Sequence, residues 1–204
     1  MIENTEIQIL EEVLRSRKGT VFFVDSFLRI ATAKTVAKAL ERLVLDGKLY
    51  RVATGMYVRP VEDEILGPIL PGIETIAAAI AKRDKARIAP TGSYALYKLG
   101  LTTQVPLNIV YYTDASPRKV TVGKQTITFK KASARNLAAT GEISKLVIQA
   151  LRTIGKDKVT ADELRLIGER LKDEKPHHLQ HDINVAPEWI RQLLRPLINT
   201  RMHD

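Results

Sequence analysis

The chain has 204 residues, 45% of them hydrophobic, and its 32 Lys and Arg against 23 Asp and Glu give a formal net charge of +9. This length and apolar content suffice for one or two folded domains and exclude a disordered chain. The sequence has no cysteine, which excludes disulfides, thiolate metal sites and cysteine nucleophiles. No segment approaches the ~20 apolar residues of a membrane helix, and residues 1–10 lack the basic start of a secretory signal, so a cytoplasmic protein is expected.

The first thirty residues predict two helices with a short extended segment between them. Apolar residues recur there at helical spacing and predict the first helix: Ile7, Leu10, Val13 and Leu14. Residues 21–24 are aromatic and β-branched, which favours an extended segment. Residues 25–30 then predict a compact second helix capped by Asp25.

The segment from Thr32 to Asp46 has the pattern of a recognition helix. One stripe of it is apolar, while the opposite face is polar and mostly cationic. The stripe consists of Val36, Leu40, Leu43 and Val44. Thr32 is expected to accept a hydrogen bond from a free N–H group at the helix start, and Gly47 to end the helix in the left-handed conformation.

Residues 48–59 alternate as a pair of strands, with Thr54-Gly55 as the predicted two-residue turn. The apolar members of the pair are Leu49, Val52, Met56 and Val58. A helix, a glycine stop and a basic hairpin are the order in which a winged helix-turn-helix presents itself to DNA.

The charge of this region favours duplex DNA as the partner. Between residues 15 and 60 there are ten Lys and Arg against three acidic residues. The predicted DNA contacts are Lys34, Thr35, Lys38 and Arg42 on the helix, with Arg51, Thr54 and Arg59 on the ribbon. Arg42 is the candidate for reading guanine, and its alternative is a salt bridge to Glu41, Asp46 or Glu12. The alternative for the whole set is that these are solvated side chains that keep a small domain soluble.

Beyond residue 60 the sequence predicts a linker and a second domain. The acidic residues 62–64, followed by two Gly/Pro pairs, indicate the linker. The predicted domains are a winged helix-turn-helix at residues 1–62 and a mixed α/β domain at residues 65–204 that ends in helices, an α+β fold class. The cleanest helix signal there is Thr160 with Glu163, which have the spacing of a capping box.

No catalytic or metal site is predicted, nor any cofactor. Three histidines lie close to Asp182, but Pro176 precedes them and a polar helix start or loop explains them better than zinc; they are His177, His178 and His181. Residues 90–93, Pro-Thr-Gly-Ser, could cradle a phosphate ahead of a helix. A nucleotidyltransferase would also need paired carboxylates, and Asp114 stands alone. The expected protein is therefore not an enzyme.

Two sets of residues resemble a known family. The first set consists of Phe27, Thr35-Val36, Leu40–Leu43, Gly47–Leu49, Arg51-Val52 and Gly55–Val58. It resembles the winged-helix domain of AbiEi-type antitoxins, which belong to type IV toxin-antitoxin systems. The second, similar to a bacterial group of AbiEi-like proteins of unassigned function, is Pro90–Gly92, Leu99–Pro106, Val110–Asp114 and Ala186–Trp189.

This resemblance implies a repressor that binds inverted repeats in the operator of its own operon and counteracts a nucleotidyltransferase-like toxin encoded beside it. A stand-alone winged-helix regulator and a protein-interaction module without a toxin are the alternatives.

Overall fold

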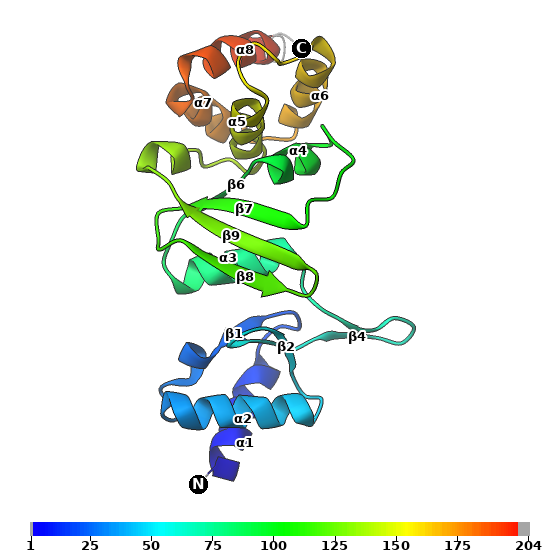
Figure 1. Cartoon of the computed structure of the whole chain (residues 1–204), viewed down its shortest axis with the longest axis vertical. Helices are drawn as coiled ribbons and strands as arrows, with labels where there is room; N and C mark the ends of the chain where they lie inside the picture. Colours follow the sequence, from blue (N-terminus) through cyan, green and yellow to red (C-terminus); the bar gives the residue numbers. More distant parts are fainter. Residues whose placement is uncertain (1, 200–204) are drawn as a thin grey trace. The chain divides into compact units, whose positions relative to one another are not determined.

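The computed structural model of the chain describes residues 2–199 (Figure 1). The chain divides into two compact units, one of residues up to Arg83 with Val120–Lys124 and the other of Asp84–Lys119 and the residues from Gln125 on. Helices with small sheets, a mixed sheet and carboxy-terminal helices confirm the predicted α+β fold class. The sequence prediction ended the first domain at residue 62, whereas this division also places residues 63–83 in the first unit.

The first unit begins with the order helix, strand, short helix, helix and strand pair. Its elements are α1 (Ile2–Arg15), β1 (Val21–Phe23), the 3₁₀ helix η1 (Val24–Phe27), α2 (Ala33–Leu45), β2 (Tyr50–Ala53), β3 (Met56–Val58), β4 (Val61–Asp63), β5 (Gly67–Ile69) and α3 (Ile73–Arg83). Strand β3 lies in the middle of an antiparallel sheet of order β1-β3-β2. The α2 helix packs on α1, and its buried residues close one apolar core with Ile9, Val13, Phe22 and Phe27.

The α1 helix forms as predicted, but its buried face differs from the expected one. Ile9 and Val13, one turn apart, are fully buried, while Ile7 and Leu14 remain 58% and 54% exposed. Apolar residues occur around most of this helix, so spacing alone identified the helix and not the side that packs on α2.

The predicted second helix and its Asp cap were wrong. The chain forms a single 3₁₀ turn at Val24–Phe27 instead, and Ser26 Oγ accepts a hydrogen bond from Phe23 N at 3.0 Å. The expected Thr32 cap is also absent, because its hydroxyl pairs with that of Thr35 at 3.1 Å. Gly47 does end α2 with a φ of +69°, as predicted.

The hairpin β2–β3 confirms the predicted ribbon and its turn. Gly55 has a φ of +68°, which a left-handed turn residue requires. The register shifts between Arg51 and Ala53, so the ribbon carries a bulge next to its turn.

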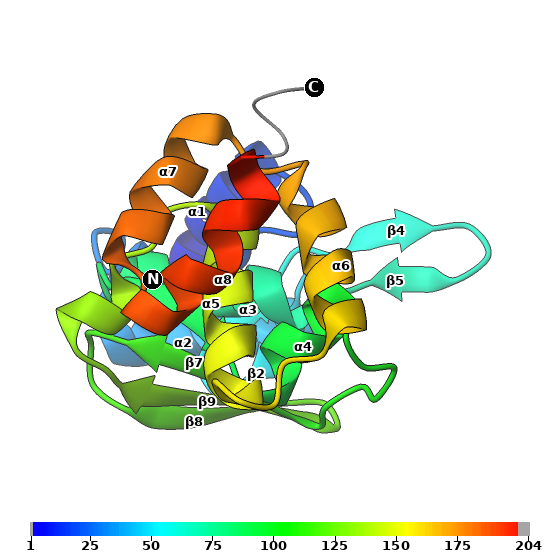
Figure 2. The ribbon, with the colours of Figure 1, turned by 90° about the horizontal axis from the view of Figure 1, so that it is seen from above.

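The segment read as a linker is a second hairpin, β4–β5, and that expectation is corrected (Figures 1 and 2). Its turn forms because Asp63 Oδ1 accepts hydrogen bonds from Ile65 N at 2.9 Å and Leu66 N at 2.8 Å. Ile65 at its tip is 93% exposed. Local side-chain bonding to the backbone thus organises an acidic, Gly/Pro-rich stretch into a strand pair.

The second unit combines a mixed sheet with a group of helices. Its elements are β6 (Ile88–Thr91), α4 (Ser93–Leu99), β7 (Asn108–Thr113), the start of β8 (Arg118–Val122, of which residues 120–122 are assigned to the first unit), β9 (Gln125–Lys131), η2 (Ala134–Leu137), α5 (Glu142–Ile154), α6 (Ala161–Leu171), α7 (Pro176–Val185) and α8 (Glu188–Asn199). The sheet has the order β6-β7-β9-β8, with β6 antiparallel and β9 parallel to β7.

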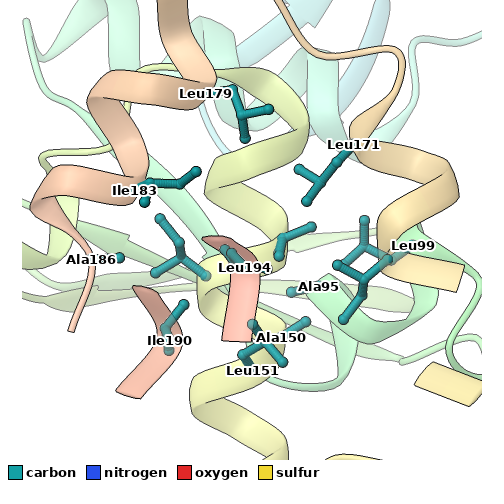
Figure 3. Close-up of a cluster of buried hydrophobic side chains, with 13 residues drawn as sticks. Ala95, Leu99, Ala150, Leu151, Leu171, Leu179, Ile183, Ala186, Ile190 and Leu194 are labelled. Carbon is teal, nitrogen blue, oxygen red and sulfur yellow. The ribbon is translucent and has the colours of Figure 1, made fainter. Parts of the chain in front are cut away.

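The helices α4 to α8 share one apolar core (Figure 3). Leu151 of α5 and Ile190 and Leu194 of α8 are fully buried in it, together with residues of α6 and α7. The α6 helix starts at the predicted capping box, in which Glu163 N donates to Thr160 Oγ1 at 3.2 Å and Thr160 N to Glu163 Oε2 at 2.8 Å. The α5 helix contacts α4, α6 and α7, so it lies at the centre of this group.

Two buried carboxylates hold the amino-terminal end of α5. Asp182 is fully buried and its oxygens accept hydrogen bonds at 2.8 Å from Thr140 N and Gly141 N. Glu174 Oε2 accepts from Ile143 N at 2.7 Å and Ser144 N at 3.0 Å. Both carboxylates thus satisfy N–H groups that a helix start leaves without partners, and they face the positive end of the helix dipole.

These carboxylates make stability dependent on pH. Burial raises the pKa of Asp182, but its hydrogen bonds from Ser144, His181, Thr140 and Gly141 outweigh burial and hold that pKa below its usual range. Burial also raises the pKa of Glu174, but hydrogen bonds from the backbone N–H groups of Ser144, Lys175 and Ile143 outweigh burial and lower this pKa. Their stabilisation is therefore complete above the unfolded pKa of about 4 and is lost as pH falls through the lower folded pKa.

We expect the free energy of unfolding to fall with acidification below about pH 4. The fluorescence of Trp189, the single tryptophan, reports denaturant unfolding of the second unit. The double variant Asp182→Asn with Glu174→Gln should be less stable than the unmodified protein at pH 7. Its free energy of unfolding should also fall less on acidification, because the two titrating carboxylates are gone. The same acid dependence in this variant would contradict the assignment.

Candidate nucleic-acid interface

The solvent face of α2 carries two free cations. Lys34 and Lys38 lie one turn apart on the side opposite the buried residues, and both are exposed. Among the described residues, neither forms an ion pair. An exposed helix face with uncompensated charge is what a helix needs to approach the phosphates of a major groove. Thr35 lies at the edge of this face, and its hydroxyl pairs with Thr32.

The ribbon follows α2 directly and adds a second set of exposed groups. The backbone N–H groups of Lys48 and Leu49 both donate to Leu43 O, at 2.9 and 3.1 Å, which fixes the start of the ribbon against the end of α2. Arg51 on the edge strand β2 and Thr54 at the turn are exposed. Their positions suit contacts with a DNA backbone beside the groove.

Arg42 lies on the flank of α2 that faces α1. Its Nη1 is 3.8 Å from Glu6 Oε2, a long and half-exposed ion pair. The partners considered from the sequence were Glu41, Asp46 and Glu12, and Glu12 pairs with Arg29 at 2.6 Å instead. Because an exposed ion pair of this length contributes little stability, Arg42 remains available to DNA at small cost.

Arg59 has a structural partner that the sequence did not reveal. Its Nη1 donates to Leu14 O at 2.7 Å and Ser16 O at 3.0 Å, with Val13 O at 3.5 Å. Cations at a helix carboxyl end satisfy its free carbonyls and favour its negative dipole end. We therefore leave Arg59 out of the proposed interface.

We expect Arg59→Gln to lower the free energy of unfolding by about 1–2 kcal/mol and to leave DNA affinity almost unchanged, because the guanidinium is engaged with α1. Hydrogen–deuterium exchange at the end of α1 and at β3 would report the loss. Arg51→Gln is the matched control in the same ribbon, with the opposite expectation of unchanged exchange and weaker DNA binding. Equal exchange in the two variants would contradict the role of Arg59.

The histidine cluster lies on α7 and serves the α5 cap. His181 Nδ1 bonds Asp182 Oδ1 at 2.8 Å, and His178 Nδ1 lies 3.7 Å from Glu174 Oε1. Within residues 2–199, no group of three or more histidines and carboxylates is placed to hold a metal ion. The same part of the chain contains no helix long and apolar enough to cross a membrane.

Residues 2–58 have the order of elements and the three-stranded sheet, β1-β3-β2, that are typical of a winged helix, with a 3₁₀ turn in place of the second helix. Residues 8–179 match the model of a family described as a family of unknown function, DUF6088, and the chain belongs to that family. This match does not name AbiEi, so the resemblance to AbiEi-type antitoxins stays a prediction.

Among solved structures, the Rv2827c protein from Mycobacterium tuberculosis is similar. The two share 12% identity with a TM-score of 0.48, over 96% of this chain and 76% of that chain. No curated protein matches the sequence.

Proposed function

We propose that this protein is a DNA-binding transcriptional regulator without enzymatic activity, which binds duplex DNA through α2 and the β2–β3 ribbon. The observation that carries the proposal is the exposed pair Lys34 and Lys38, unpaired within the described residues, on the helix that a winged helix places in the major groove. Arg42, Arg51, Thr35 and Thr54 complete the proposed interface. The basic excess of residues 15–60 supplies the attraction to phosphate.

Fluorescence anisotropy with the full-length protein tests this function. The probes are the duplex upstream of its own reading frame and a shuffled duplex of the same length, each at several salt concentrations. We expect tighter binding of the upstream duplex and, for four to six phosphate contacts, a log–log salt slope of roughly −4 to −5. No binding to either duplex at low salt would contradict the proposal.

The finer proposal is an AbiEi-like antitoxin that represses its own operon at inverted repeats and counteracts a nucleotidyltransferase-like toxin. It is supported by the residue resemblance in both parts of the chain, including Leu99–Pro106 and Ala186–Trp189. Co-expression with the product of the adjacent gene should restore growth that this product alone arrests. Absence of rescue would leave a stand-alone regulator.

A further inference from the structure

A polar cavity of about 290 Å³ lies in the second unit, between one face of its sheet and α5. Strands β7 and β9 place Tyr112 directly beside Lys130, and β6 places Thr91 beside Val110 on the same face. Because α5 packs on β6, its residues Arg152 and Thr153 close the other side of the cavity. These side chains come from four elements, so the cavity is built by the fold and not by one loop.

The charge of this cavity is positive and uncompensated. No carboxylate lines it, and neither Arg152 nor Lys130 forms an ion pair within residues 2–199. Arg152 is half-buried and its Nη1 donates to the neutral Asn136 Oδ1. Burial lowers the pKa of Arg152, Tyr112 opposes this shift, and the neighbouring Arg135 lowers the pKa further. An anion that enters the cavity would therefore be attracted to the half-buried guanidinium and would stabilise its charged form.

Two hydroxyl groups and the accessible backbone of Gly92 lie beside the two cations. Thr91 and Tyr112 contribute hydroxyl groups, and Gly92 lies beside them with a φ of +66° and a ψ of −147°, a conformation that favours glycine. A Cβ added at Gly92 would meet no atom within 4 Å, so the space above this backbone is open.

We propose that this cavity binds the phosphate group of a small phosphorylated molecule. A phosphate monoester carries close to two negative charges, which match one guanidinium and one ammonium. The planar guanidinium can bond two phosphate oxygens at once, and the hydroxyls suit the remaining one. The volume lies near the lower limit of small-molecule sites, which favours a compact ligand over a duplex. This inference does not depend on DNA binding by α2.

Isothermal titration calorimetry with the full-length protein tests the site, with inorganic phosphate, AMP and adenosine as probes. Phosphate and AMP should bind and adenosine should not. Lys130→Gln should weaken AMP binding about tenfold, as expected for one charge-assisted hydrogen bond, and Arg152→Gln at least as much. Lys131→Gln is the matched control, because the next residue of β9 points to the opposite face and its Nζ bonds Asp114 O.

Because Lys130 is exposed, we expect Lys130→Gln to fold normally, and Trp189 fluorescence would verify this. The Lys130→Gln variant therefore still tests the site if Arg152→Gln does not fold. Absence of binding by AMP and phosphate at millimolar concentration would overturn the proposal. So would equal effects of Lys130→Gln and Lys131→Gln. If Lys130→Gln weakened duplex binding and left AMP binding unchanged, the cavity would belong to a nucleic-acid surface, which also overturns it.

Discussion

Replacing Lys34 and Lys38 together by glutamate is expected to lower the affinity for upstream DNA about 100-fold or more. The change removes two phosphate contacts and adds two repelling carboxylates on the same helix face. Because each contact contributes about 0.9 to the log–log salt slope, the slope should also become shallower by about 2. Both side chains are exposed, so the circular dichroism spectrum should not change. Anisotropy titrations at several salt concentrations measure both effects.

The matched control replaces Lys156 and Lys158, exposed residues in the turn after α5, by glutamate. This variant has the same change in net charge outside the proposed interface, so it separates a local contact from general attraction to DNA. We expect its affinity to stay close to that of the unmodified protein. An equal loss of affinity in both double variants would remove α2 from the interface.

Gly141→Ala should destabilise the second unit by about 3 kcal/mol, the largest stability change that we expect from a single methyl group. An added Cβ would lie 2.3 Å from Ser144 Oγ and 2.4 Å from Glu174 Oε2. Both groups take part in the cap of α5, where Ser144 Oγ donates to Asp182 Oδ2 at 2.5 Å. The methyl group therefore either displaces the carboxylate of Glu174 or shifts the start of the helix, and the first-turn N–H groups lose partners.

Denaturant unfolding followed by Trp189 fluorescence measures this loss, and Gly168→Ala provides the control. Gly168 lies inside α6, where an added Cβ would meet Leu197 Cδ2 at an ordinary 3.7 Å. Alanine is favoured over glycine in a helix by up to about 1 kcal/mol, so this variant should be neutral or more stable. Equal stability of the two variants would mean that the space at Gly141 is not limiting.

The features that the sequence predicted well are those whose cause is local. The capping box at Thr160 and Glu163, the helix end at Gly47 and the turn at Gly55 each depend on residues a few positions apart. The buried stripe of α2 followed from helical spacing for the same reason, since Val36, Leu40 and Leu43 are all buried.

The features that the sequence did not reveal are contacts over long separations. Asp182 caps a helix that starts forty residues earlier, and Arg59 bonds the end of the first helix, so no local pattern identifies either partner. The parallel pairing of β7 with β9 brings Tyr112 beside Lys130, and α5 adds Arg152. The sequence alone therefore did not show that Lys130 and Arg152 lie beside residues 90–93, the segment considered for binding a phosphate.

The bond between Arg59 and α1 sets a limit on how the proposed DNA-binding domain can be isolated. A fragment that stops at the last residue of β3 would lack Arg59. The carbonyls of Leu14 and Ser16 would then be left to water, and the chain after β3 would no longer be bonded to the end of α1. A transplantable module must therefore extend through Arg59, and hybrid regulators should be joined after that residue and not at the strand end.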